Sequence, residues 1–315
     1  METIRLTLHE HWSPPSPSVM ALGTFDGLHI GHQEILSQGK AEAKRRGVPF
    51  AVFLCDPHPR QVLGIGAEYD VLLTPLPEKL RLLEHYGADL VYILMFTREV
   101  AAVAPEQFVL DLLLPLAPEA LVAGFDYTFG AGGKGDAALL KAMGETRALP
   151  VWILPPVNRY GEKVSSSLIR ERLRYGEVKL VRELLGRPYA LTGRVVKGEG
   201  RGIGIGFPTA NLQLNDPFLI PGTGVYLVRA FWGMEKGPGV MNIGVRPTFY
   251  DRGTLSLEVH LLDHRVDLYG EEMRVEFLDY LRPEQRFDSV DRLVAQIEQD
   301  VCTARNLWRT AQGDE

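Results

Sequence analysis

The stretch Ser18–His32, SVMALGTFDGLHIGH, joins an apolar run to a glycine-containing turn and then to a helical pattern. A short apolar run that ends at a turn is typical of a buried strand. His29 and His32 follow the turn three residues apart, so both rings lie on one face of a helix. Free N–H groups and the helix dipole favour an anion at a helix N-terminus. The stretch therefore predicts a strand–turn–helix unit that can bind a polyphosphate.

Spacing alone leaves two other interpretations of the histidine pair open. A metal site would need further ligands, and none is found nearby in the sequence; ordinary surface histidines would need no partner at all. Two other motifs follow apolar runs and are expected at the same sheet edge, CDPHP (Cys55–Pro59) and GFDYTFG (Gly124–Gly130). In VSSSLIR (Val164–Arg170), hydroxyls at a helix start precede an arginine. That motif is either a plain helix cap or a phosphate clamp.

The first half of the chain alternates strand-like runs with helical patterns. The runs are residues 18–22, 50–55, 89–96, 120–125 and 151–157, and the helical patterns are Gln33–Arg46, Pro77–Tyr86, Pro105–Leu114 and Asp136–Arg147. Nearly continuous apolar strands separated by helices predict a parallel sheet covered on both faces, a Rossmann-like α/β domain. Ligands of such sheets bind outside the carboxyl ends of the strands, where the turn after Leu22 lies.

The second half has a different pattern. After two short helical stretches, residues 166–176 and 177–186, six strand-like runs follow: residues 189–196, 209–214, 224–232, 239–244, 255–262 and 272–281. Six such runs predict a closed all-β barrel. Apolar residues at helical spacing then predict an amphipathic helix packed on the barrel: Val290, Leu293, Val294, Ile297 and Val301. We expect two domains, residues 1–186 and 187–315.

Composition limits the partners of the protein. The chain has 315 residues and a net charge of −6, which gives no general attraction for nucleic acid or an anionic membrane. No apolar run approaches the ~18 residues of a membrane span. Its two cysteines cannot form a disulfide framework and lack metal-ligand spacing. We therefore expect a cytoplasmic protein without nucleic-acid or membrane partners, in which any phosphate chemistry is local.

Two common nucleotide-binding motifs are missing from the chain. No Walker-type P-loop occurs, and the glycines of KGEGRGIGIGF (Lys197–Phe207) do not give the dinucleotide fingerprint. We interpret this segment as a mobile glycine-rich flap, with a flexible hairpin as the alternative. Thr209 and Asn211 follow it in GFPTAN and project to the same side of an extended segment. Their hydroxyl and amide oxygens suit Mg²⁺ that also binds phosphate.

One carboxylate in the barrel is a candidate general base. In LSLEVHL, four apolar residues alternate with Ser256, Glu258 and His260, so these three share the opposite face. If that face lines a cavity, Glu258 can activate a hydroxyl; the alternative is an exposed residue on an amphipathic strand. A base, a magnesium pair and a glycine flap in one small domain are the parts of a kinase.

These motifs together identify a family resemblance. Over nearly its whole length the chain resembles the bacterial bifunctional riboflavin kinase/FAD synthetase family. The resemblance rests on GTFDGLHIGH, DPHP, GFDYTFG and VSSSLIR in the first half and on GFPTANL, GVYLV, GVMNIGVRPTF, LEVHLLD, DLYG and FLDYLRPEQRFDSVDRLVAQIEQD in the second. It implies an N-terminal nucleotidylyltransferase domain that converts FMN and ATP to FAD and pyrophosphate. It implies a C-terminal riboflavin kinase barrel that uses ATP and Mg²⁺ to make FMN.

The resemblance also implies roles for individual residues. His29 and His32 would stabilise the triphosphate and the transition state, Asp126 would lie at the adenylylation site, and Arg170 with the serines of its motif would hold pyrophosphate. In the kinase, Thr209 and Asn211 would bind Mg²⁺ and Glu258 would be the base. The implied nucleotide-binding residues are Gly23, Phe25, Asp26, Gly27, His29, His32, Asp126, Ser165, Ser166, Ser167, Arg170, Gly198, Gly202, Gly206, Pro208 and Thr209. The implied flavin-binding residues are Asp56, His58, Pro59, Glu258 and Arg286.

The chain departs from the family pattern at three places. Ser167 replaces a usual threonine and keeps the hydroxyl, Ile203 replaces a usual flap arginine, and residues 131–133 lack basic side chains that are often present. The last two departures bear on ATP binding. Two alternatives stay open: an enzyme with only one live site, and a nucleotidylyltransferase for another phospho-alcohol fused to a non-catalytic barrel. Self-association is also left open.

Overall fold

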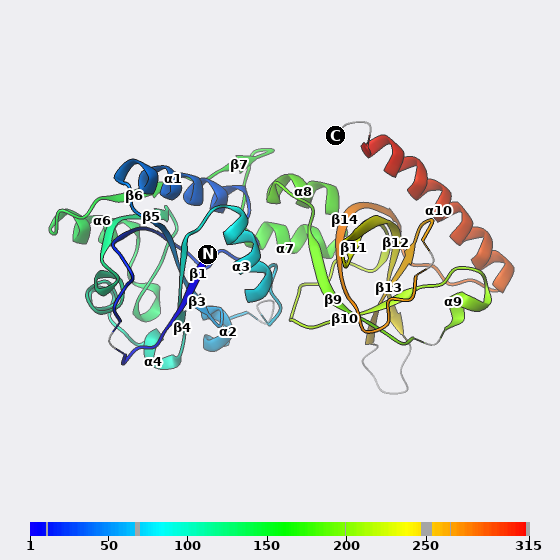
Figure 1. Cartoon of the computed structure of the whole chain (residues 1–315), viewed down its shortest axis with the longest axis horizontal. Helices are drawn as coiled ribbons and strands as arrows, with labels where there is room; N and C mark the ends of the chain where they lie inside the picture. Colours follow the sequence, from blue (N-terminus) through cyan, green and yellow to red (C-terminus); the bar gives the residue numbers. More distant parts are fainter. Residues whose placement is uncertain (11, 67–69, 199, 247–253, 265, 313–315) are drawn as a thin grey trace. The chain divides into compact units, whose positions relative to one another are not determined.

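The computed structural model describes residues 1–10, 12–66, 70–198, 200–246, 254–264 and 266–312 (Figure 1). The chain divides into two compact units, Met1–Ser166 and Ser167–Glu315. This division falls at the start of the first of the two short helices before the barrel. Our boundary after residue 186 stays a prediction.

The first unit is built on a parallel sheet, as the sequence predicted. In the described part of the chain it has six strands in the order β1-β4-β3-β2-β5-β6. The strands are β1 (Glu2–Leu6), β2 (Ser18–Leu22), β3 (Phe50–Asp56), β4 (Leu90–Met95), β5 (Pro118–Gly124) and β6 (Val151–Leu154). All neighbours in this sheet are parallel. The edge strand β1 was not predicted, because only Leu6 in it is fully buried and its apolar signal is weak.

Helices cover both faces of this sheet (Figure 1). Val19 and Ala21 of β2 pack with side chains of α1 and α3, whereas Met20 and Leu22 pack with η2 and α6. Alternate residues of one strand therefore enter two hydrophobic cores, which is why the strands read as continuous apolar runs. The elements are α1 (Ile30–Arg46), α2 (Pro59–Leu63), α3 (Leu76–His85), α4 (Arg98–Ala101), α5 (Pro105–Gln107), η2 (Phe108–Leu113), η3 (Leu114–Leu116), η4 (Ala131–Gly133), α6 (Ala137–Glu145), β7 (Asn158–Arg159) and β8 (Glu162–Lys163).

The second unit contains the predicted closed barrel. Its described strands follow the order β10-β13-β12-β11-β14-β9, and β9 pairs with both β10 and β14, which closes the sheet. The elements are α7 (Ser166–Arg174), α8 (Val178–Leu185), β9 (Ala190–Val196), α9 (Arg201–Gly204), β10 (Ala210–Leu214), β11 (Gly224–Trp232), β12 (Glu235–Arg246), β13 (Thr254–Leu261), β14 (Glu272–Arg282) and α10 (Val290–Gln312). The proposed flap contains the short helix α9, and its residue 199 lies outside the described residues.

The terminal helix α10 packs on the barrel as predicted, except that Val290, the first residue of the predicted stripe, is 60% exposed. Val301 and Ala304 of α10 are buried in one cluster with Val225, Leu227 and Val240 of the barrel. The apolar stripe of the helix therefore covers strands β11 and β12. Among the described residues, no helix has the length and apolar content that crossing a membrane requires.

Candidate active sites

Three motif turns meet at one edge of the parallel sheet. Strand β2 lies between β3 and β5, and all three run in the same direction. The motif after β2 (GTFDG) and the motifs that begin at the last residues of β3 (DPHP) and β5 (GFDYTFG) therefore share the carboxyl edge. Strands β3 and β4 follow β2 on one side of it, and β5 and β6 follow on the other side. The strand order therefore reverses between β2 and β5, and such sheets bind ligands at this topological switch point.

His29 is the N-cap of α1. Its backbone is extended, and its Nδ1 accepts a hydrogen bond of 3.3 Å from the backbone N of His32. The helix begins at Ile30, three residues before the predicted start, because this side chain supplies the cap. With Nδ1 acting as acceptor, the neutral imidazole carries its proton on Nε2.

The two histidine rings lie against each other. Their centroids are 3.7 Å apart with an interplanar angle of 15°, and the edge of the buried Phe25 ring meets His32 with centroids 5.3 Å apart. The predicted common face is thus present. Spacing alone did not show that Phe25 supports one of the rings, although Phe25 was among the residues implied by the resemblance.

Asp126 follows β5 and is exposed. Its Oδ2 lies 2.6 Å from the Nζ of Lys163, and the same ammonium lies 4.5 Å from the centroid of the Phe125 ring. The pair is exposed on both sides, so its net contribution to stability is small. An acidic and a basic group therefore stand side by side at this sheet edge.

The DPHP motif has a structural role that its sequence did not reveal. His58 is buried and caps α2: its Nδ1 accepts from Arg60 N at 3.2 Å, and its backbone N donates to Gln61 Oε1 at 3.1 Å. Asp56 ends β3, and its neighbour Cys55 is a packed thiol whose pKa burial raises to about 12. The predicted contact of Asp56, His58 and Pro59 with a flavin remains a prediction.

The serine motif contacts the turn between β2 and α1 (residues 24–27) through one hydroxyl. Ser166 Oγ donates a 2.8 Å hydrogen bond to the carbonyl oxygen of Asp26. Ser165 is half-buried, Ser167 is exposed and Arg170 is buried on α7. The proposed pyrophosphate contacts of these residues remain predictions.

In the barrel, Glu258 lies in a row of polar residues. It is directly opposite Asn211 of β10 on one side and Asn242 of β12 on the other. Side chains at directly opposed positions of antiparallel strands emerge on the same face. Glu258 is half-buried. The register therefore joins the candidate base to one predicted magnesium ligand, and it adds Asn242, which the sequence analysis did not single out.

Glycines of the flap approach this row closely. A Cβ on Gly198 would overlap the side chain of Asn211, and a Cβ on Gly202 would overlap the carbonyl of Phe207 and lie 3.5 Å from Thr209 Oγ1. Gly206 has a φ of +90°, a backbone conformation that favours glycine. Each of the three glycines thus has a physical reason, and Gly198 and Gly202 bring the flap close to Asn211 and Thr209.

His260 fixes the start of GFPTAN. Its Nδ1 lies 2.8 Å from the carbonyl oxygen of Pro208 and donates to it, and its ring meets Phe207 edge to face at 5.4 Å. His260 lies two residues from Glu258 and therefore on the same face of β13. The alternation placed His260 on the polar face, but no motif gave it a role.

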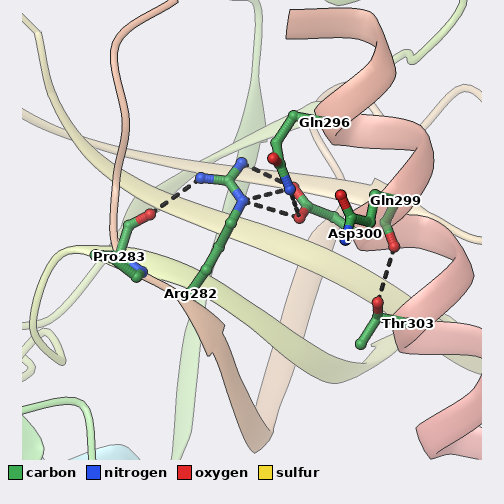
Figure 2. A network of polar contacts seen from close by, with 6 residues as sticks. All are labelled: Arg282, Pro283, Gln296, Gln299, Asp300 and Thr303. Atoms are coloured by element: carbon green, nitrogen blue, oxygen red, sulfur yellow. Dashed lines mark hydrogen bonds and ion pairs between the residues drawn. The ribbon is translucent and has the colours of Figure 1, made fainter. Parts of the chain in front are cut away.

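A buried ion pair links the end of β14 to α10 (Figure 2). Arg282 Nε donates to both carboxylate oxygens of Asp300 at 2.8 and 3.1 Å, and Nη2 donates to Oδ2 at 2.8 Å. Gln296 Nε2 adds a hydrogen bond of 3.0 Å to the same carboxylate. This network anchors both ends of the segment that carries Arg286, which is exposed and whose flavin contact remains a prediction.

Known proteins give an independent comparison. A model described as FAD synthetase matches residues 12–168, and one described as riboflavin kinase matches residues 185–308. Proteins named bifunctional riboflavin kinase/FMN adenylyltransferase are similar over most of the chain. The Bacillus subtilis protein is 38% identical over 95% of this chain and 96% of its own. The Escherichia coli K12 protein is 39% identical over 98% of both chains. A crystal structure described as a macrolide-efflux protein from Streptococcus pneumoniae is 35% identical, covers 97% of this chain and 99% of its own, and superposes with a TM-score of 0.89.

Proposed function

The chain belongs to the family of bifunctional riboflavin kinases/FMN adenylyltransferases, and we propose that its two reactions use separate sets of side chains, one in each unit. The enzyme phosphorylates riboflavin to FMN with ATP and adenylylates FMN to FAD. The riboflavin kinase match covers the barrel, and the FAD synthetase match covers strands β2 to β6 of the parallel sheet. Riboflavin, ATP, FMN and FAD are therefore its substrates and products.

In the kinase reaction we assign Glu258 as the general base. Its carboxylate accepts the proton of the riboflavin 5'-hydroxyl, the hydroxyl oxygen bonds to the γ-phosphorus of ATP, and the bond from that phosphorus to ADP breaks. The half-buried position of Glu258 opposite Asn211 and Asn242 supports the assignment. Phosphoryl transfer depends on positioning and charge neutralisation, and a single base with polar neighbours meets that need.

Thr209 and Asn211 would hold Mg²⁺. A hydroxyl and an amide oxygen fit an ion that keeps most of its water and also binds phosphate oxygens. The close approach of the Gly198 backbone to Asn211 supports this, because a side chain there would displace the amide. When bound, Mg²⁺ would neutralise charge on the phosphates.

In the adenylyl transfer we assign His29 and His32 to the triphosphate. A phosphate oxygen of FMN bonds to the α-phosphorus of ATP, and the bond to pyrophosphate breaks, so the reaction needs no protein nucleophile. The stacked rings at the N-terminus of α1 present donors to oxygens on which charge accumulates. We further propose that Asp126 lies at the same site and that Ser165, Ser166, Ser167 and Arg170 hold the departing pyrophosphate.

The single observation that carries the assignment of separate sites is the register that joins Glu258 to Asn211 within the barrel. Chromatography of flavin products tests it. Wild-type enzyme with riboflavin, ATP and Mg²⁺ should yield FMN and then FAD. The variant Glu258→Gln should lose FMN formation and still convert added FMN to FAD. Loss of both activities in a folded Glu258→Gln protein would contradict separate sites.

We place both reactions in the cytoplasm. Cys55 and Cys302 are free thiols, which suits a reducing compartment. The net charge of −6 supports small-molecule partners over nucleic acid. Fractionation of cells that produce the protein at native level would test the location.

A further inference from the structure

Two buried polar side chains contact the turn between β2 and α1 from a segment that carries no motif. Thr74 and Lys79 are 3% and 2% exposed, and they lie just before and within helix α3. The reactions described above assign no role to either residue. Both make hydrogen bonds to residues 24–27, the turn between β2 and α1.

Thr74 holds the turn with three hydrogen bonds. Its Oγ1 accepts from Gly27 N at 2.8 Å and donates to the carbonyl oxygen of Phe25 at 3.4 Å. Its backbone N donates to Asp26 Oδ1 at 3.1 Å. A single residue therefore contacts three consecutive positions of the turn, and the hydroxyl accounts for two of those contacts.

Lys79 holds the first residue of the turn. Its Nζ donates a 2.8 Å hydrogen bond to the carbonyl oxygen of Thr24. Burial lowers the pKa of Lys79, and the nearby carboxylates of Asp26 and Asp56 oppose that shift. A buried lysine is costly unless it is paired and hydrogen-bonded, so the bond to Thr24 is what offsets its burial here.

The turn needs such support because its backbone is unfavourable. Phe25 and Leu28 have φ values of +50° and +41°, and Gly27 has +85°. Left-handed conformations of non-glycine residues cost on the order of 1–3 kcal/mol each and persist only when the surroundings over-determine them. The same turn sets the position of His29, which caps α1, and of Phe25, whose ring contacts His32.

We propose that Thr74 and Lys79 are positioning residues for adenylyl transfer. They hold the strained turn in the conformation that presents the stacked histidines to the triphosphate. The inference rests on the proposed role of the histidines. It adds that the segment before and within α3 serves FMN adenylylation in the first unit and not riboflavin phosphorylation.

Paired variants of Thr74 test the proposal in the full-length enzyme. Thr74→Val keeps the volume and removes the hydroxyl, whereas Thr74→Ser keeps the hydroxyl. Because displacements of about 1 Å can cost ~10²-fold in rate, we expect Thr74→Val to lower kcat/KM for FMN adenylylation at least ~10-fold, mainly in kcat. Thr74→Ser should stay within ~3-fold of wild type, which a role in packing alone would not produce. Riboflavin phosphorylation should be unchanged in both.

His32→Ala, assayed in parallel, separates failure of this inference from failure of the proposed function. If His32→Ala is impaired and Thr74→Val is not, Thr74 does not position the turn. If Thr74→Ser is as impaired as Thr74→Val, the hydroxyl is not the cause, and the inference is overturned. If His32→Ala itself retains full activity, the role of the histidines is wrong. If Thr74→Val shows no unfolding transition of the first unit, it has not folded and Lys79→Met takes its place. Folded Lys79→Met should show the same selective loss of adenylylation, and full activity in that variant overturns the inference.

Discussion

Breaking the Arg282–Asp300 pair should strongly destabilise the barrel unit. Both side chains are largely buried, at 15% and 7% exposed, and three charge-assisted hydrogen bonds join them. Removing one partner of a buried pair costs about 3–5 kcal/mol, because the other charge is left buried and unpaired. Asp300→Asn keeps one acceptor oxygen, so we expect about 2–4 kcal/mol of destabilisation. That loss corresponds to roughly 6–12 °C in the melting temperature of a unit of this size.

An exposed pair at the N-terminal end of the same helix provides the control, with Arg292 in α10 and Asp288 two residues before it. Arg292 and Asp288 lie 3.4 Å apart and are 74% and 91% exposed. Because exposed pairs are worth about 0–1 kcal/mol, Asp288→Asn should shift the melting temperature by no more than about 3 °C. Urea and thermal unfolding of both variants measure the difference. Asp300→Asn should also raise the KM for riboflavin, since it loosens the segment before α10, and should leave FMN adenylylation unchanged. Equal melting temperatures for the two variants would refute the reasoning.

Three further predictions concern other parts of the molecule. Gly198→Ala should lower riboflavin phosphorylation at least ~10-fold and raise the Mg²⁺ requirement, because the new Cβ displaces Asn211; Gly204→Ala, which meets open space, should have little effect in the same kinetic assay. His29→Ala should lower FMN adenylylation at least ~10-fold and spare the kinase, as product chromatography would show; an unchanged rate of FAD synthesis would contradict its role. Arg45 and Arg46 lower the pKa of Glu42 from 4.5 to about 2, so its carboxylate stabilises the fold above pH ~4.5 and loses this effect as the pH falls towards 2. After allowance for the exposure of Arg45, Glu42→Gln should cost about 1–2 kcal/mol at pH 7 and almost nothing at pH 2, measured by urea unfolding.

Much of the architecture could be predicted from sequence because burial imposes simple patterns. Strand β2 is buried on both faces and reads as a continuous apolar run, and the stripe from Val290 to Val301 reads as a helix. Strand β1 escaped because it lies at the sheet edge, where polar residues are tolerated. The starting residue of α1 was also missed, since it depends on a cap formed by His29, a residue type that is not a standard N-cap.

The sequence predicted residues of the candidate sites only where they belong to short motifs. Glu258 and Asn211 could be named separately, but their direct opposition depends on strand register, which the sequence does not state. The register with β12 places Asn242 opposite Glu258, and the contact with Pro208 gives His260 a role; the sequence showed neither. Thr74 and Lys79 contact a turn about 50 residues away in the chain, and nothing local in the sequence indicates that contact.

Complementation between two variants tests the central claim most directly. Glu258→Gln alone should convert no riboflavin, and His32→Ala alone should convert riboflavin to FMN and make FAD at least ~10-fold more slowly than wild type. A mixture of the two full-length proteins with riboflavin, ATP and Mg²⁺ should make FAD at a rate well above that of His32→Ala alone, because FMN released by one protein is adenylylated by the other. If the mixture makes no more FAD than His32→Ala alone, although each folded variant retains its expected single activity, FMN does not pass between independent sites. If Glu258→Gln cannot use added FMN, the assignment of the two reactions to two separate sites is wrong.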